Sequence, residues 1–118
     1  MKTILLAEDD DSMRRLLEVI LKKEGFEVIS TDDGLQAMKL AFENRIDAVV
    51  ADAIMPGLTG YDLCRILKNK DELKNIPFVI LSGLGVNDNE TAKCTADAFL
   101  SKSPNLKEEL LEKLKELL

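Results

Sequence analysis

The sequence predicts an α/β fold in which a single parallel sheet is covered by helices on both faces. The first indication is a set of five short apolar runs with the β-branched content and near-continuous apolarity of buried parallel strands. These runs are residues 4–7, 28–29, 46–51, 78–81 and 98–100. The second indication is that amphipathic helical patterns separate the runs. The third is the length, because 118 residues accommodate one domain and hence one sheet.

The connections between the runs predict the topology. Right-handed crossovers place helices on both faces and favour the strand order 2-1-3-4-5, with a ligand crevice outside the carboxyl ends of strands 1 and 3. The last helix is expected to begin with Ser103 as its N-cap and Pro104 at its first helical position. Between Ser82 and Ala98, two Gly and two Asn favour at most a short helix at about 88–94.

The composition excludes several classes of function. Twenty-two acidic and 16 basic residues give a net charge of −6, which disfavours direct binding of nucleic acid. No apolar run approaches the roughly 18 residues of a membrane span or forms a signal-peptide core, so we expect a cytoplasmic protein without a membrane contact. The absence of His excludes a histidine base, zinc ligand or phosphohistidine in this chain. Cys64 and Cys94 form no CxxC motif, which excludes a zinc cluster and fits a reducing compartment, although a disulfide is possible.

Acidic residues follow two of the predicted strands at the edge where the crevice is expected. Glu8 and Asp9 come directly after the first strand, and Asp52 follows the third. These strands are neighbours in the predicted order, so the three carboxylates should converge and raise one another's pKa. A hard divalent cation makes such a cluster tolerable, and Mg²⁺ also leaves coordination positions for a phosphate.

The fourth and fifth predicted strands end in Ser82 and Lys102. A carboxylate nucleophile, a metal, a hydroxyl and an ammonium are together the groups needed to transfer a phosphoryl group to an aspartate. Each residue also has an ordinary explanation: an acidic run can cap a helix, and a strand-end Asp, Ser or Lys can simply face a loop or solvent. Suitable groups at four different strand ends favour the functional interpretation.

Several segments of the chain resemble one known family. Residues 50–60, Val-Ala-Asp-Ala-Ile-Met-Pro-Gly-Leu-Thr-Gly, are similar to the phosphoacceptor loop of response-regulator receiver domains, the phosphoacceptor modules of two-component signalling. The other matching positions are the acidic pair Glu8 and Asp9, the turn Asp33–Gly34, Ser82, the switch aromatic Phe99, and Lys102. The resemblance covers essentially the whole chain. It implies a flavodoxin-like fold of five β-α units, with residues 1–118 as one receiver domain and no output domain.

The resemblance also implies a role for the residues of the acidic edge. Asp52 is the expected phosphoacceptor. Asp9, Asp52 and the backbone carbonyl of Ile54 would hold Mg²⁺, with Glu8 acting through a water molecule. Lys102 would pair with the phosphoryl group. The donor would be a phosphohistidine on a histidine kinase or a histidine phosphotransfer protein.

A conformational switch is a further implication of the resemblance. Ser82 would move to bond the phosphoryl group, and Phe99 would turn inward to fill the space that Ser82 leaves. The face around the fourth helix, fifth strand and fifth helix would then signal to a downstream effector of unknown identity, and it is also a candidate homodimer surface. The protein would be a signalling phosphoacceptor rather than an enzyme, although it would assist its own phosphorylation and autodephosphorylation.

Two departures from the family pattern keep one alternative open. Lys102 is followed by Ser103-Pro104 rather than directly by Pro, and the spacing from Ser82 to Lys102 is about two residues shorter than usual. Both favour a pseudo-receiver, which is a protein-interaction module that takes no phosphate. The complete set of acidic, hydroxyl and ammonium groups favours an active receiver.

Three other classes of protein share parts of the pattern. A haloacid-dehalogenase-type phosphatase needs a second Asp where this chain has Ile54. A flavodoxin-type FMN binder needs a Ser/Thr-rich phosphate loop after the first strand, where this chain has the acidic run 8–11. A P-loop enzyme needs the motif GxxxxGK[ST], which does not occur.

Overall fold

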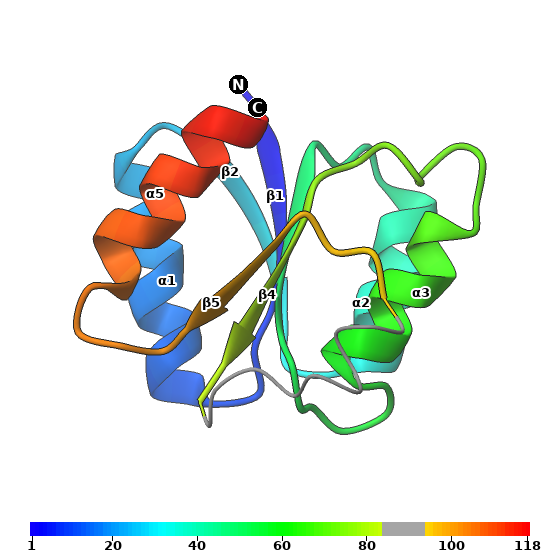
Figure 1. The fold of residues 1–118 in the computed structure, drawn as a ribbon, viewed down its shortest axis with the longest axis horizontal. Helices are drawn as coiled ribbons and strands as arrows, with labels where there is room; N and C mark the ends of the chain where they lie inside the picture. Colours follow the sequence, from blue (N-terminus) through cyan, green and yellow to red (C-terminus); the bar gives the residue numbers. More distant parts are fainter. Residues whose placement is uncertain (84–93) are drawn as a thin grey trace.

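The computed structural model describes residues 1–83 and 94–118, and its strands form one parallel sheet. The strands are β1 (Thr3–Ala7), β2 (Glu27–Thr31), β3 (Ala48–Asp52), β4 (Phe78–Ser82) and β5 (Ala98–Ser101). Their order across the sheet is β2-β1-β3-β4-β5, which confirms the predicted topology. Because neighbouring strands are parallel, all five carboxyl ends meet at one edge. The arrowheads of β4 and β5 in Figure 1 point to this edge, and both chain termini lie at the opposite end.

Helices cover both faces of the sheet. The described helices are α1 (Asp11–Lys23), α2 (Gly34–Glu43), α3 (Gly60–Lys68) and α5 (Leu106–Leu117). Figure 1 shows α1 and α5 on one face and α2 and α3 on the other, as the crossover rule predicts. The short helix expected at about 88–94 lies, apart from Cys94, outside the described residues. In the described part of the chain, no helix has the length and apolarity that a membrane crossing requires.

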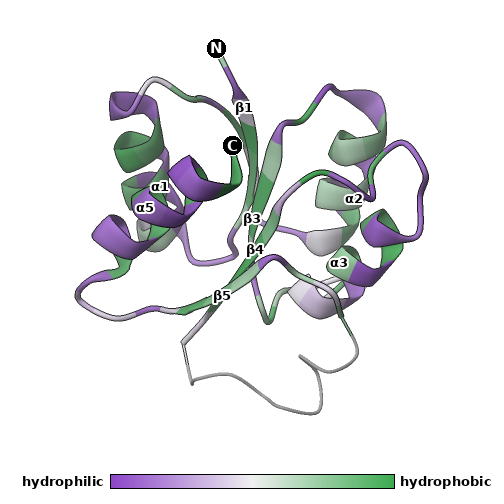
Figure 2. Cartoon of the chain, turned by 45° about the horizontal axis from the view of Figure 1, so that its top comes forward, coloured by the Kyte–Doolittle hydropathy of each residue, from purple (hydrophilic) through white to green (hydrophobic). Residues whose placement is uncertain are grey.

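The sheet can be covered by helices on both faces because successive side chains along each strand point to opposite faces. Ile4 and Leu6 point into the core shared with α1 and α5, whereas Leu5 and Ala7 point into the core shared with α2 and α3. All four side chains are fully buried. Figure 2 shows the strands as mainly hydrophobic and the outer sides of the helices as mainly hydrophilic. Burial on both faces therefore explains the continuous apolar runs seen in the sequence.

Side-chain caps determine where three of the helices begin. The Asp10 carboxylate accepts a hydrogen bond from the Met13 N–H at 2.7 Å and so caps α1. Asp33 caps α2 in the same way, and Thr59 caps α3 through the Asp62 N–H at 3.1 Å. Each cap satisfies N–H groups that have no partner within the helix. The chain therefore leaves the carboxyl edge of the sheet along defined paths.

The expected N-cap of the last helix at Ser103 is wrong. Helix α5 begins at Leu106 with Asn105 as its N-cap, and Asn105 makes no side-chain capping bond. Ser103 instead forms a turn, because its Oγ accepts from the Asn105 N–H at 3.3 Å and its carbonyl accepts from the Leu106 N–H at 3.0 Å. The Ser-Pro signal thus marks a turn that leads directly into the helix.

The loop after β3 is packed tightly against its neighbours. A Cβ atom on Gly60 would lie 2.2 Å from the carbonyl oxygen of Asp52, so only glycine fits at this position. The Gly60 N–H donates to the Ala53 carbonyl at 2.8 Å, and the Gly34 N–H donates to the Pro56 carbonyl at 3.0 Å. These bonds fix the loop against the starts of α2 and α3, and with it the end of the strand that carries Asp52.

Candidate functional site

Three carboxylates converge at the carboxyl edge of the sheet. Strand β1 pairs with β3 in the register Ala7↔Ala51, so the next residues along the chain, Glu8 and Asp52, emerge side by side. One carboxylate oxygen from each of Glu8, Asp9 and Asp52 lies within 4.8 Å of the others. The parallel topology therefore brings together the three acidic residues that the sequence placed at these strand ends.

The three carboxylates differ in their exposure. Glu8 is 0% exposed, Asp52 is 7% exposed, and Asp9 faces solvent. The cluster thus has an inner carboxylate, a central one at the end of β3, and an outer one at the mouth of the site. A ligand that approaches from solvent meets Asp9 and Asp52 before it meets Glu8.

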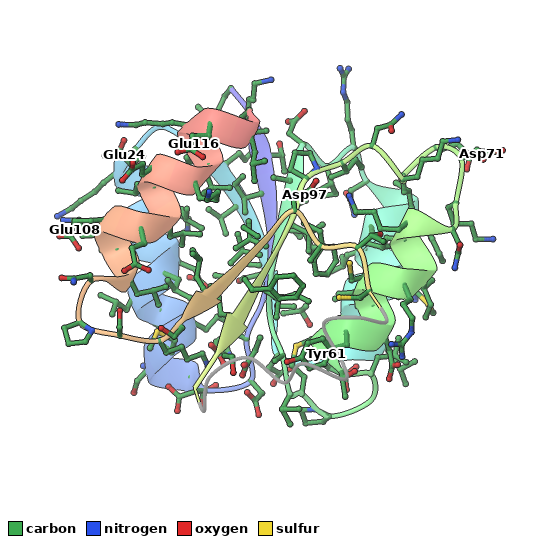
Figure 3. The ribbon with its side chains drawn as sticks, viewed as in Figure 1. Glu24, Tyr61, Asp71, Asp97, Glu108 and Glu116 are labelled. Carbon is green, nitrogen blue, oxygen red and sulfur yellow. The ribbon has the colours of Figure 1, made fainter. Side chains whose placement is uncertain are left out.

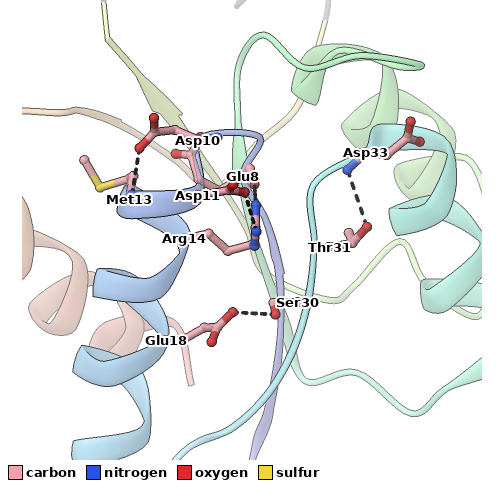
Figure 4. A network of polar contacts seen from close by, with 9 residues as sticks. All are labelled: Glu8, Asp10, Asp11, Met13, Arg14, Glu18, Ser30, Thr31 and Asp33. Carbon is pink, nitrogen blue, oxygen red and sulfur yellow. Dashed lines mark hydrogen bonds and ion pairs between the residues drawn. The ribbon is translucent and has the colours of Figure 1, made fainter.

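A network of hydrogen bonds holds Glu8 in its buried position (Figure 4). The Glu8 N–H donates to the Thr31 carbonyl at 3.0 Å, and its Oε2 accepts from the Asp10 N–H at 3.2 Å. Arg14 reaches back from α1 and donates from Nη1 to the Glu8 carbonyl at 3.0 Å. Sequence reasoning missed Arg14, although its i,i+3 spacing from Asp11, with which it forms an ion pair at 2.6 Å, was a usable signal.

Lys102 bridges the two buried carboxylates. Its Nζ lies 2.7 Å from Glu8 Oε1 and 3.1 Å from Asp52 Oδ2, and its side chain is 16% exposed. The Lys102 N–H donates to the Ser82 carbonyl at 2.8 Å, which fixes its backbone beside the end of β4. No described peptide bond is cis, so the Lys102–Ser103 bond is trans. The displaced proline therefore does not prevent the ammonium from reaching the acidic cluster.

The remaining predicted residues lie around this cluster. Ser82 is 8% exposed at the end of β4, and the residue before it, Leu81, pairs with Asp52 in the β3–β4 register. Phe99 in β5 is half-buried and packs against the core that the sheet shares with α2 and α3. Ile54 lies two residues after Asp52, with its side chain 67% exposed. Strands β4 and β5 thus extend the site on the side away from β1.

Burial and charge shift the pKa values of two groups in the site. Burial raises the pKa of Asp52 above its ordinary value of 3.8, and the hydrogen bond and charge of Glu8 raise it further, while Lys102 partly opposes the shift. Burial acts to lower the pKa of Lys102, but its bond to Glu8 and the charges of Asp52 and Glu8 outweigh burial and raise it. The ammonium is therefore retained, whereas ionisation of Asp52 is less favourable in the metal-free fold than in the unfolded chain.

This shift predicts how the stability of the metal-free protein depends on pH. Because the pKa of Asp52 is raised by folding, the unfolded chain ionises first as the pH rises from about 3.8, and stability falls until the folded pKa is reached. Asp52→Asn should therefore melt at a higher temperature than the parent at pH 7, and this difference should shrink as the pH falls below 3.8. Melting curves recorded in EDTA measure this difference in melting temperature. Asp71→Asn is the control, because the Asp71 side chain is 94% exposed. An Asp52→Asn variant that melts at or below the parent temperature at pH 7 would contradict the prediction.

The donor set of the cluster suits a hard divalent cation. It consists of carboxylate oxygens from two adjacent strand ends, and Mg²⁺ binds through one or two carboxylates while it keeps several waters. Thiol and imidazole ligands, which softer metals prefer, are absent from the three residues of the cluster. The residues present therefore fit Mg²⁺.

The fold and this acidic site define a class of signalling domain, and the chain belongs to it. Residues 4–115 match the family described as the response regulator receiver domain. Receiver domains are the phosphoacceptor modules of two-component systems, so the family and the flavodoxin-like fold predicted from the sequence are confirmed.

Several known proteins resemble the chain over most or all of its length. It is 33% identical over 114 residues to Protein PilG of Pseudomonas aeruginosa, which covers 95% of this chain and 84% of PilG. It is 30% identical to the phosphate regulon transcriptional regulatory protein PhoB of the same species, which covers 99% of this chain but 52% of PhoB. The chain thus spans about half the length of that relative. Among solved structures, the response regulator TrrA of Thermotoga maritima in complex with Mg²⁺-BeF aligns over 100% of both chains, with a TM-score of 0.89 and 32% identity.

Proposed function

We propose that Asp52 accepts a phosphoryl group from a phosphohistidine on a partner histidine kinase or histidine phosphotransfer protein. The observation that carries this proposal is the position of the Lys102 ammonium, 3.1 Å from Asp52 Oδ2 beside two further carboxylates. An aspartate flanked by a cation and a site for a divalent metal ion has the surroundings that phosphoryl transfer requires. The Mg²⁺-BeF bound to the related TrrA supports the same interpretation.

The proposed transfer step uses the arrangement of this site. A carboxylate oxygen of Asp52 attacks phosphorus, the P–N bond to the donor imidazole breaks, and the released nitrogen takes up a proton. Lys102 carries three N–H donors, so it can keep its contact with Glu8 while it pairs with a phosphoryl oxygen. Asp9, Asp52 and the Ile54 carbonyl would hold Mg²⁺, with Glu8 acting through a water molecule, and the bound ion would supply positive charge to the phosphoryl oxygens.

The proposed readout starts at the neighbouring strands. Ser82 is expected to bond the phosphoryl group, and Phe99 to turn toward the space that Ser82 leaves. This proposal is supported by the buried position of Ser82 next to the Lys102 backbone and by the half-buried position of Phe99 one strand away. The output surface would comprise β5, α5 and the expected fourth helix, which apart from Cys94 lies outside the described residues, and it is also the candidate homodimer surface.

Several expectations from the sequence stay predictions. They are the action of residues 1–118 as one receiver domain, the cytoplasmic location, the lack of direct nucleic-acid binding, the downstream effector and the autodephosphorylation of Asp52. Phosphorylation of residues 1–118 alone would also test whether this domain accepts phosphate by itself.

The proposal predicts a covalent change that mass spectrometry detects. Incubation with acetyl phosphate and Mg²⁺ should add the mass of one phosphoryl group to the parent protein. The Asp52→Asn variant should gain nothing, Asp71→Asn should react like the parent, and EDTA should block the reaction. An unchanged parent mass would identify the protein as a pseudo-receiver, and a gain of mass by Asp52→Asn would place the acceptor elsewhere.

A further inference from the structure

Two cysteines that the proposed function does not use lie together in the core between the sheet and α2 and α3. Cys64 on α3 is 0% exposed, and Cys94, which precedes β5, is 6% exposed. Both thiols are free. Burial, the neighbouring Cys94 thiol and a hydrogen bond between the two side chains raise the pKa of Cys64 to about 12. Two residues 30 positions apart in the sequence are thus in direct contact.

A second contact holds the same two segments together one helical turn further along. Lys68, four residues after Cys64 on α3, places its Nζ 2.9 Å from Oδ2 of Asp97, three residues after Cys94. The same carboxylate oxygen accepts from the Phe78 N–H at 2.7 Å. Figure 3 shows Asp97 at the start of β5. The segment that leads into β5 is therefore fixed along α3 at two points, and this keeps the two thiols in register.

We propose that Cys64 and Cys94 form an oxidisable pair, which hydrogen peroxide converts into an intrachain disulfide between α3 and the segment before β5. The Cys94 sulfur, the more exposed of the two, attacks a peroxide oxygen, and the O–O bond breaks to give a sulfenic acid and water. The Cys64 sulfur then attacks the Cys94 sulfur, so that the S–S bond forms, the S–O bond breaks and a second water leaves. The two thiols lose two electrons and two protons, and the peroxide is reduced to water.

The environment of Cys64 suits the second of these two roles. Its fully buried thiol stays protonated at neutral pH, which makes it a poor first nucleophile toward a peroxide from solvent. Its contact with Cys94 nevertheless places it where a sulfenic acid would form. This division of roles predicts that Cys94→Ala protects Cys64 from peroxide, whereas Cys64→Ala leaves Cys94 able to form a sulfenic acid that a dimedone probe captures.

The disulfide would also change the stability of the fold. It would close a loop from residue 64 to residue 94, which includes β4. This loop would reduce the conformational entropy of the unfolded chain. The oxidised protein should therefore melt roughly 5–15 °C above the reduced protein. This proposal does not depend on the phosphorylation of Asp52, and a failure of either leaves the other standing.

To test the proposal, the protein (residues 1–118) is treated with hydrogen peroxide. It is then unfolded without a reductant, and its free thiols are alkylated. The expected product is a monomer that has lost the mass of two hydrogen atoms, carries no alkyl group and gives one cross-linked peptide containing both cysteines. Dithiothreitol should restore two alkylatable thiols, and the melting temperature should return to that of the reduced protein.

The outcomes that would overturn the proposal are also measured on the unmutated protein. Two alkylatable thiols after peroxide treatment would overturn it, provided that the same peroxide oxidises the unfolded chain. A disulfide between two chains, or oxygen added to either sulfur without a cross-link, would overturn it as well. Because these measurements need no substitution, a cysteine variant that fails to fold does not affect them.

Discussion

Lys102→Met should slow the phosphorylation of Asp52 by acetyl phosphate by about 10²–10³-fold, the usual loss when one preorganised donor to a developing anion is removed. The Lys102 Nζ lies 3.1 Å from Asp52 Oδ2, and its backbone is tied to Ser82, so it needs little rearrangement to pair with a phosphoryl oxygen. Methionine keeps an unbranched side chain as far as Cε and removes the ammonium. The initial rate of mass gain at saturating Mg²⁺ measures the effect.

The same substitution should also destabilise the metal-free protein. Loss of the ammonium leaves Glu8, which is fully buried, and Asp52 without their compensating charge, at a cost of about 3 kcal/mol in the free energy of unfolding. Mg²⁺ should restore part of this loss. Lys107→Met, at an exposed lysine of α5, removes the same charge and is the matched control for both measurements. A Lys102→Met protein with the rate and the stability of Lys107→Met would show that the ammonium has neither role.

The convergence of the acidic cluster was predictable because it depends on topology alone. Parallel strands present their carboxyl ends at one edge, and the order 2-1-3-4-5 places the ends of β1 and β3 side by side. Glu8, which directly follows β1, and Asp52, the last residue of β3, must then be neighbours whatever their side chains do. The positions of Ser82 and Lys102 at the ends of β4 and β5 follow from the same rule.

Features that depend on side-chain packing could not be predicted in this way. The sequence does not show that Glu8 is the innermost carboxylate, because its burial depends on bonds from Asp10 and Arg14 and on the contact with Lys102. The start of α5 was missed for a related reason. Ser103 has two competing backbone partners in the turn, and local preference alone did not decide between a cap and a turn.

Asp9→Asn should weaken the binding of Mg²⁺ by about 10- to 100-fold. Asp9 is the exposed carboxylate of the cluster, whereas Glu8 is buried and paired with Lys102, so Asp9 and Asp52 are the carboxylates most able to contact a hydrated ion. Asp10→Asn is the matched control. It removes the same charge one residue away, and asparagine replaces aspartate well as an N-cap of α1.

The central claim is that Glu8, Asp9 and Asp52 together form one magnesium site, and a calorimetric titration with Mg²⁺ tests it most directly. The predicted result is one ion per chain for the parent and for Asp10→Asn, with greatly weakened binding for both Asp9→Asn and Asp52→Asn. Absence of binding by the parent, or equal affinities for Asp9→Asn and Asp10→Asn, would contradict it.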